Sequence, residues 1–238
     1  MRRAVTDYEM IKPGDKIAVG VSGGKDSLCL LEALSRYQKF SPIPFSIEAI
    51  TIDMGLEGMD FEPVKEFCQK LGVNYTIRKT DIAQVVFEYR KEKNPCSLCA
   101  KMRRGALNNA AKELLCNKVA LGHHSDDVVE TFFLCLLYEG RVYCFSPVTY
   151  LDKTDLYLIR PFLYLPEREI KRYVYNNDVP VVESKCPADK HTSRQVVKDM
   201  LSDMYKKDHC LKQKLFTAIQ NSGIEGFAVD NIKPLPPL

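Results

Sequence analysis

Short runs of apolar residues alternate along the chain with longer segments whose apolar positions recur every three or four residues. The short runs are rich in β-branched residues, which is typical of buried strands. They predict strands over residues 16–20, 46–53, 75–79, 118–124 and 156–161. The longer segments predict helices over residues 28–34, 61–71, 82–91, 101–115, 128–138 and 166–176. This alternation predicts an α/β fold with a doubly wound, five-stranded, mostly parallel sheet, as in Rossmann-like proteins.

The two ends of the chain do not continue this alternation. Residues 1–15 form a short basic lead-in that turns into the first strand. After residue 187 the pattern is helical, and the Pro-rich end at 233–238 is typical of a loose tail. We therefore predict an α/β domain over residues 1–185 and a helical C-terminal segment over residues 186–238 that packs on the same domain.

Composition narrows the class of protein. A chain of 238 residues is long enough for one large α/β domain with a small appendage. Its 45% hydrophobic and 27% charged residues exclude wholesale disorder, and its net charge of +3 is compatible with an RNA partner without requiring one. No apolar run reaches the length of a membrane span, and the first residues lack the apolar core of a signal peptide. We expect no membrane partner and a cytoplasmic protein.

The most informative stretch is Ser22-Gly23-Gly24-Lys25-Asp26-Ser27, between the first strand and the first helix. The glycines let backbone N–H groups approach a ligand, and the start of a helix favours a phosphate. The two serines supply hydroxyl donors, and Lys25 supplies a positive charge. The Walker pattern would require glycine at position 19 and serine or threonine at position 26, so it does not fit. The stretch predicts a phosphate-binding loop, and the alternative is a plain glycine turn.

Further polar residues follow the predicted strands at the carboxyl edge of the sheet, where ligands of doubly wound folds bind. They are Asp53, residues 122–127 and Arg160. Asp127 is a candidate Mg²⁺ ligand or acid–base group near the phosphates. Asp126 is explained equally well as an acid that complements the helix dipole behind an N-cap at Ser125.

His123 and His124 stand beside the two aspartates, so a zinc site is a further interpretation of this segment. Adjacent side chains on a strand point to opposite faces of the sheet. At most one of the two histidines could therefore join such a site.

The chain carries nine cysteines, which in a reducing compartment are thiols or metal ligands rather than a disulfide framework. Five lie among apolar residues and are predicted to pack in the core: Cys29, Cys68, Cys116, Cys135 and Cys144. Cys210 is not assigned. Cys96 and Cys99 form a Cys-x-x-Cys pair ahead of a basic helix, whose Arg103 and Arg104 would lower the pKa of the thiols. Cys186 supplies a third thiol from far along the chain.

Spacing alone leaves several interpretations of these three thiols open. They could hold an iron–sulfur cluster with one iron left open, or a structural zinc ion with His191 as fourth ligand. The pair could also be a redox dithiol, or the three could be unrelated. Basic residues gather around them and suit a phosphate backbone, although each is also typical of a solvated helix face: Lys101, Arg103, Arg104, Lys185, Lys190 and Arg194.

Taken together, these motifs resemble those of a known enzyme family. The hexapeptide SGGKDS resembles the PP-loop of the ATP pyrophosphatase superfamily, whose sheet is of the HUP type. The order SGGKDS, PCSLCAKMRRG, ALGHHSDD, IRPF and KCPADKHTSRQ is similar to that of the tRNA 2-thiocytidine synthetase-like family over residues 16–194. The chain departs from that family in having one cysteine, Cys186, where the family has a second pair.

The resemblance implies an ATP-dependent tRNA sulfurtransferase that uses Mg²⁺ and a 4Fe-4S cluster, adenylates a cytidine-like base and replaces its 2-oxygen with sulfur. It implies that Cys96, Cys99 and Cys186 bind the cluster and that Lys25, Asp127 and Cys186 are catalytic. It also implies these nucleotide-binding residues: Ser22, Gly23, Gly24, Lys25, Asp26, Ser27, Asp53, Gly122 and Asp127. The implied partners are tRNA and a sulfur donor, either sulfide or sulfur derived from a cysteine desulfurase, and a homodimer is allowed.

Two other classes of function remain compatible with the sequence. One is an adenylating PP-loop enzyme that forms lysidine or an amide and carries structural zinc. The other is a non-catalytic protein that binds RNA or senses ATP. The metal content separates the first from a sulfurtransferase, and release of pyrophosphate separates the second.

Overall fold

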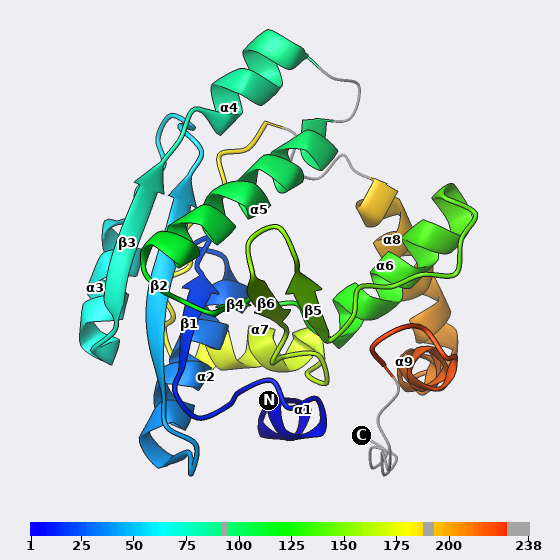
Figure 1. Cartoon of the computed structure of the whole chain (residues 1–238). Coiled ribbons are helices and arrows are strands. Elements are labelled where there is room, and N and C mark those ends of the chain that lie inside the picture. The colour runs from blue at the N-terminus through cyan, green and yellow to red at the C-terminus, as the bar shows by residue number, and fades with distance from the viewer. Residues whose placement is uncertain (92–94, 188–192, 228–238) are drawn as a thin grey trace.

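The computed structural model describes residues 1–91, 95–187 and 193–227. Its centre is a six-stranded sheet in the order β3-β2-β1-β4-β6-β5 (Figure 1). The strands are β1 Asp15–Gly20, β2 Phe45–Asp53, β3 Asn74–Lys79, β4 Lys118–Ala120, β5 Val148–Leu151 and β6 Leu156–Ile159. The predicted Pro-rich tail, together with Lys190 and His191, lies outside the described residues.

Neighbouring strands are parallel except for the last pair, in which β5 runs antiparallel to β6. The mostly parallel α/β sheet is therefore confirmed, but the predicted number of five strands is wrong. The missed strand, β5, is only four residues long and is joined to β6 by a tight turn. A run this short carries too little pattern to identify a strand, and its pairing with β6 is what defines it.

The helices are α1 Arg2–Asp7, α2 Lys25–Phe40, α3 Glu62–Leu71, α4 Ile82–Gln84, α5 Pro95–Glu113, α6 Ser125–Tyr138, α7 Glu167–Asn176, α8 Ser193–Lys207 and α9 Leu211–Asn221. A π-helical segment, η1 Val85–Arg90, follows α4 directly. Each helix predicted within residues 28–176 is present, with boundaries shifted by a few residues. None of the helices in the described part of the chain is both long and apolar enough to cross a bilayer.

Helices cover both faces of the sheet because alternate residues of a buried strand point to opposite sides. In β1, Ile17 and Val19 pack with the apolar residues of α1, α2, α3 and α7 on one face. Ala18, between them, packs with α5 on the other face, where Leu107 and Ala110 meet it. Figure 1 shows α5 lying across that second face. This arrangement places the start of α5, with its cysteines, over the carboxyl edge of the sheet.

The N-terminal segment differs from its prediction as a lead-in. It forms the short helix α1, in which Ala4 and Val5 are buried, and Met10 and Ile11 behind it are buried as well. Six residues without a side-chain cap give a weak helical signal in the sequence. Burial of these apolar side chains against the core stabilises the helix instead.

The helices after residue 187 form a third apolar cluster with α6. Val128 and Val129 of α6 pack with Val197 and Leu201 of α8 and with Phe216 of α9. The predicted helical C-terminal segment is thus present and packs on the α/β domain. The domain boundary at residue 185 stays a prediction.

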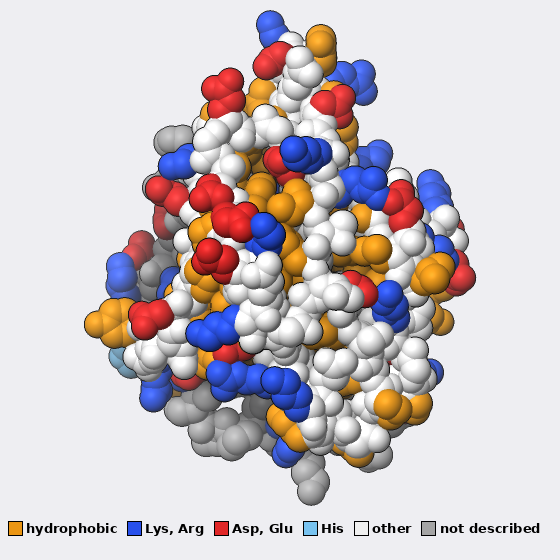
Figure 2. Space-filling model, turned by 90° about the vertical axis from the view of Figure 1, so that its left-hand side faces the viewer, with side chains coloured by type: hydrophobic (Ala, Val, Ile, Leu, Met, Phe, Trp, Pro, Cys, Tyr) orange, Lys and Arg blue, Asp and Glu red, His pale blue; other side chains and the backbone are white. Residues whose placement is uncertain are grey.

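At one edge of the sheet, β3 leaves a row of backbone groups unpaired. Its last residues, Arg78 and Lys79, are exposed, and Arg78 pairs with Glu113 of α5. On this face of the molecule, Lys and Arg side chains mingle with Asp and Glu (Figure 2). Charges along an exposed edge strand disfavour pairing with another chain.

Candidate active site

The predicted phosphate-binding loop follows β1 and is fixed by hydrogen bonds within itself. The Ser22 N–H donates to Ser27 Oγ at 3.1 Å, and Ser27 Oγ donates to the Gly24 carbonyl at 2.9 Å. Gly23 has φ of +82°, and a Cβ there would lie 3.0 Å from the Cβ of Val182. Both conditions favour glycine at this position. The loop therefore leads into the N-terminus of α2 in a compact, fixed shape.

Gly122 lies after β4 and touches this loop. A Cβ at Gly122 would lie 2.8 Å from the Asp26 carbonyl oxygen and 3.2 Å from the Ser27 nitrogen. These are backbone atoms, which cannot turn away as a side chain could. Absence of a side chain at Gly122 therefore lets the segment after β4 lie directly against the start of α2.

A cavity of about 370 Å³ opens at this edge of the sheet. That volume falls in the range typical of small-molecule sites. Its lining combines the loop, the ends of β1, β2 and β4, and the first turns of α5: Gly20, Val21, Ser22, Gly24, Asp26, Ser27, Ile50, Ile52, Ala100, Arg103, Arg104, Leu107, Asn108, Leu121, Gly122, His123, Asp127 and Leu158. Ile50 and Ile52 of β2 make the lining apolar there, and the polar groups come from the loop, from α5 and from the segment after β4. A planar base against β2 with phosphates on the loop fits this distribution.

One polar atom in the cavity wall lacks a protein partner. Asn108 is 7% exposed, and its side-chain oxygen is buried without a hydrogen bond in the described part of the chain. An unpaired buried polar group costs about 1–3 kcal/mol. A bound nucleotide could offset that cost, so Asn108 supports the fit of such a ligand. The sequence signal for Asn108 is a polar residue on the otherwise apolar face of α5.

Lys25 points away from the cavity wall in this structure. Its ammonium pairs with Asp26 at 2.8 Å and with Glu167 at 3.0 Å. Burial opposes the charge of Glu167, but hydrogen bonds from Lys25 and Lys171 outweigh burial and lower the pKa of Glu167 to about 2. The sequence alone did not identify Glu167 as a site residue, because an acid in the first turn of a helix is ordinary.

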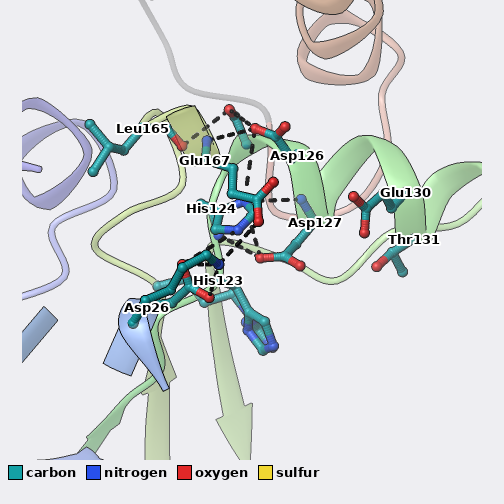
Figure 3. Close-up of polar contacts among 12 residues, drawn as sticks. Asp26, His123, His124, Asp126, Asp127, Glu130, Thr131, Leu165 and Glu167 are labelled. Carbon is teal, nitrogen blue, oxygen red and sulfur yellow. Dashed lines mark hydrogen bonds and ion pairs between the residues drawn. The ribbon is translucent and has the colours of Figure 1, made fainter. Parts of the chain in front are cut away.

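Asp127 lies in the first turn of α6, where it forms a capping box with His124 (Figure 3). The His124 N–H donates to Asp127 Oδ2 at 2.9 Å, and the Asp127 N–H donates to His124 Nδ1 at 3.4 Å. The prediction of Ser125 as N-cap is wrong, because the imidazole reaches the helix N–H and Ser125 Oγ instead donates to Leu165 at 3.1 Å. Asp127 also lines the cavity, with Arg194 3.5 Å from its Oδ1.

Asp126 faces away from the cavity and is buried. Its Oδ2 accepts the Glu167 N–H at 2.9 Å, and Lys212 of α9 pairs with its other oxygen. These contacts join α6, α7 and α9. Of the two interpretations of Asp126, the structure favours the structural one.

Asp53 lies at the end of β2, as predicted, but does not line the cavity described here. Its Oδ1 accepts the Gly55 N–H at 2.9 Å and thereby shapes the turn after the strand. Its backbone carbonyl accepts from Thr80. The structure does not bring the Asp53 side chain together with the other predicted nucleotide-binding residues.

The three distinctive thiols gather at the start of α5. Cys96 is exposed, and Cys99 and Cys186 are partly exposed. Burial raises the pKa of Cys99, the nearby thiols of Cys186 and Cys96 raise it further, and Arg103 lowers it. The predicted net lowering is therefore wrong for Cys99, because burial outweighs the arginine.

The thiols of Cys186 and Cys96 both act on the pKa of Cys99, so the fold brings Cys186 into the region of the pair although it is distant in sequence. Their exposure leaves room for a group bound between them, and thiolates are the ligands of iron–sulfur clusters. The donor set therefore fits a cluster. Within the described residues, no three His, Cys, Asp or Glu side chains converge on one metal-ion position. The five cysteines predicted to pack in the core are all buried.

The chain matches the PP-loop domain family over residues 2–204. It is 38% identical to the tRNA-cytidine(32) 2-sulfurtransferase of Neisseria meningitidis serogroup A / serotype 4A, over 92% of this chain and 69% of that protein. It is 40% identical to the enzyme of the same name from Pseudomonas putida strain GB-1, over 92% of this chain and 80% of that protein.

Solved structures similar to this chain include a tRNA thiolase. The U34-tRNA thiolase NcsA from Methanococcus maripaludis, with its 4Fe-4S cluster, is similar with a TM-score of 0.77 and 27% identity, over 94% of this chain and 78% of that one. The phosphoadenylyl-sulfate reductase from Candida auris has a TM-score of 0.51 at 16% identity, over 80% of this chain and 88% of that one, and shares the fold.

Proposed function

Because the chain belongs to the PP-loop family, and within it to the tRNA 2-thiocytidine synthetase-like enzymes, we propose that it is an ATP-dependent tRNA sulfurtransferase. One observation in the structure carries this proposal. A single cavity is lined both by the PP-loop and by the helix that bears Cys96 and Cys99. The cavity reaches Ala100, the residue after Cys99, so the thiols lie beside the proposed nucleotide site.

ATP fits the cavity with its base against the apolar side formed by Ile50, Ile52 and Leu107. Its phosphates then lie on the PP-loop, where backbone N–H groups at the start of α2 and the hydroxyl of Ser22 donate to them. Lys25 would exchange a carboxylate for a phosphate oxygen, since an ammonium has three donors. Mg²⁺ that accompanies ATP would offset phosphate charge, and Asp127, which lines the cavity, would bind it or act as an acid–base group.

The first step activates the base. The 2-oxygen of a cytidine attacks the α-phosphorus, the bond to the β-phosphate breaks, and pyrophosphate leaves with its charge offset by Lys25. Sulfur then replaces the activated oxygen, which departs in AMP. When bound by Cys96, Cys99 and Cys186, a 4Fe-4S cluster supplies an iron with an open position for sulfur.

The relatives are named for cytidine 32 of tRNA, so we propose that base as the target. Basic side chains near the cavity mouth, Arg103, Arg104 and Lys101, suit the phosphates of an RNA backbone. The sulfur donor is sulfide, or the persulfide sulfur of a cysteine desulfurase after a two-electron reductant, such as a thiol, has reduced it to the sulfide level. A tRNA-modifying enzyme works where tRNA is, which favours the cytoplasm, and a homodimer is compatible with these assignments.

The first experiment measures iron, sulfide and zinc, with a visible spectrum, on protein purified without oxygen. Cys186→Ala is compared with Cys210→Ala, which removes an exposed thiol elsewhere. We expect about four irons and four sulfides per chain, lost in the first variant and kept in the second. One zinc and no iron would contradict the cluster and favour an enzyme that forms lysidine or an amide.

The second experiment supplies ATP, Mg²⁺, sulfide and tRNA, and measures pyrophosphate together with the thiolated nucleosides by mass spectrometry. We expect 2-thiocytidine, and sequencing of the product gives its position. Thiolated uridine would instead identify a uridine as the target base, as in the U34-tRNA thiolase from Methanococcus maripaludis. ATP binding without pyrophosphate release for any tRNA would favour a non-catalytic protein.

A further inference from the structure

His123 lies on the polar side of the cavity and is held there by a buried arginine. Its ring stacks on Phe145, with ring centres 4.9 Å apart. Arg160 Nε donates to His123 Nδ1 at 3.3 Å. Arg160 is 6% exposed and is fixed in turn by the Ser146 carbonyl and by Thr149 Oγ1 at 3.1 Å. The imidazole therefore has a defined orientation before any ligand binds.

This contact sets the position of the imidazole proton. An arginine N–H can only donate, so Nδ1 of His123 must accept and the proton of the neutral ring is on Nε2. Among the hydrogen bonds of the described residues, the one that involves the His123 ring is at Nδ1, and none starts from Nε2. The ring lines the cavity and points away from the carboxylates around His124 (Figure 3). An N–H donor thus faces the cavity without a protein partner.

The surroundings also keep this ring uncharged. Burial lowers the pKa of His123, and the charges of Arg160, Arg194, His124 and Arg104 lower it further, to about 3. The imidazole therefore carries a single ring proton and no charge at neutral pH. It acts as a fixed hydrogen-bond donor instead of a general acid or base.

The position of the ring limits the groups to which it can donate. His123 directly follows Gly122, which touches the backbone at the start of α2, where the phosphates of a nucleotide belong. Ile50 and Ile52 of β2 and Leu107 of α5 supply the apolar lining that suits the base of ATP. His123 therefore lies on the side from which a second reactant approaches the phosphates.

We propose that His123 is a catalytic residue whose neutral Nε2–H donates a hydrogen bond to an oxygen at the reaction centre, and that Arg160 is the residue that positions it. The acceptor is an α-phosphoryl oxygen of the nucleotide or the carbonyl oxygen of the attacking base. The α-phosphoryl group and this carbonyl come into contact during the reaction. No proton is transferred, and no bond of the imidazole breaks. The inference rests on the proposed function for the identity of these two reactants.

The tautomer is tested without any substrate. Imidazole nitrogens of ¹⁵N-histidine protein are followed by NMR between about pH 5 and 8, and the His123 signals are assigned by their loss in a His123 variant. We expect the Nε2–H form throughout that range. Protonation of His123 within it, or a proton on Nδ1, would overturn the proposal.

The catalytic role is tested with a pair of variants. His123→Leu removes the donor, and His123→Gln keeps an N–H near the same place, with His209→Gln as the control. We expect the leucine variant to lose about a hundredfold or more in the rate of pyrophosphate release, as when one transition-state donor is removed. The glutamine variant should recover a large part of that loss. Equal rates for wild type and His123→Leu would overturn the proposal.

ATP affinity, measured by calorimetry without tRNA, separates the two acceptors. A weaker affinity in His123→Leu identifies a phosphoryl oxygen, and an unchanged affinity with a slower tRNA-dependent step identifies the base. If neither the ATP affinity nor the rate of the tRNA-dependent step changed, the role of His123 as a hydrogen-bond donor would be refuted. If the wild type releases no pyrophosphate with tRNA, the proposed function fails, while the tautomer and the ATP affinity still decide the role of His123.

The positioning role of Arg160 is tested by the pKa and the tautomer of His123, which a purely structural role of Arg160 would not affect. Arg160→Met removes the charge and the donor, so the pKa of His123 should rise and the ring should lose its fixed tautomer. Arg160→Lys keeps the charge and should keep His123 uncharged. An unaltered His123 NMR signal in folded Arg160→Met would exclude a positioning role for Arg160.

Discussion

At the scale of single residues, the closest steric constraint in the site falls on Gly122. Backbone atoms of Asp26 and Ser27 occupy the space that a side chain at Gly122 would need. Gly105, in α5, has nothing within 4 Å of its would-be Cβ and offers a matched comparison. The two glycines separate the effect of close approach from the general effect of adding a methyl group.

Gly122→Ala should push the segment after β4 away from the PP-loop. We expect a loss of about 1–3 kcal/mol in stability and a clearly weaker affinity for ATP. Gly105→Ala should instead stabilise its helix by about 0.5–1 kcal/mol and leave ATP binding unchanged. Chemical denaturation and calorimetry measure both quantities. Full ATP affinity in Gly122→Ala would show that the loop tolerates displacement.

Glu167 links protonation to stability at the same scale. Its pKa in the folded protein is about 2, below its ordinary value of 4.5. The ionised carboxylate therefore stabilises the fold above about pH 4.5, and this contribution is lost as the pH falls towards 2. Glu167→Gln should be less stable than wild type at neutral pH, and the difference should shrink with acidification. A constant difference across that range would contradict this assignment.

At the scale of elements, α8 is joined to the site by ion pairs and to the core by apolar contacts. Arg194 lies 3.4 Å from Glu130 and 3.5 Å from Asp127, and Lys198 lies 3.3 Å from Glu167. Val197 on the same helix is 1% exposed, while Val196 beside it is 59% exposed. Packing of α8 thus holds basic groups against the acidic start of α6.

Val197→Ala should destabilise the protein by about 1–3 kcal/mol, because it leaves a cavity between α6, α8 and α9. Val196→Ala makes the same chemical change on the exposed side of the helix and should alter stability by less than about 0.5 kcal/mol. Thermal or urea unfolding measures the difference. Equal effects of the two substitutions would mean that α8 is not anchored by this cluster.

At the scale of the whole molecule, the PP-loop, the three thiols and basic side chains of α5 lie along one edge of the sheet. Lys101 is exposed on α5, between the cysteines and Arg103. Lys39 is equally exposed but lies near the other end of α2, away from the PP-loop. If tRNA binds along the cavity edge, only the first of these lysines contributes to its affinity.

Lys101→Ala should weaken tRNA binding and reduce the slope of log affinity against log salt by about 1, because one phosphate contact releases its counterions. Lys39→Ala should leave both quantities unchanged. Affinity measured over a series of salt concentrations gives the two slopes. An effect of Lys39→Ala as large as that of Lys101→Ala would place the RNA on a different surface.

The sequence by itself determined five of the six strands in the described residues, the PP-loop and the family. Those features depend on local patterns: runs of β-branched residues, two glycines between a strand and a helix, and motifs in a fixed order. The sequence also marked Cys96, Cys99 and Cys186 as unlike the other cysteines, because they stand outside apolar surroundings.

Only the tertiary structure decided which side chains meet. It added α1 and β5, which are stabilised by packing and pairing rather than by local pattern. It showed that Asp53 does not line the cavity and that His124, not Ser125, is the N-cap of α6. Contacts such as Lys25 with Glu167, or His123 with Arg160, join residues far apart in the chain. Their distances follow from how the strands and helices pack, which no local pattern contains.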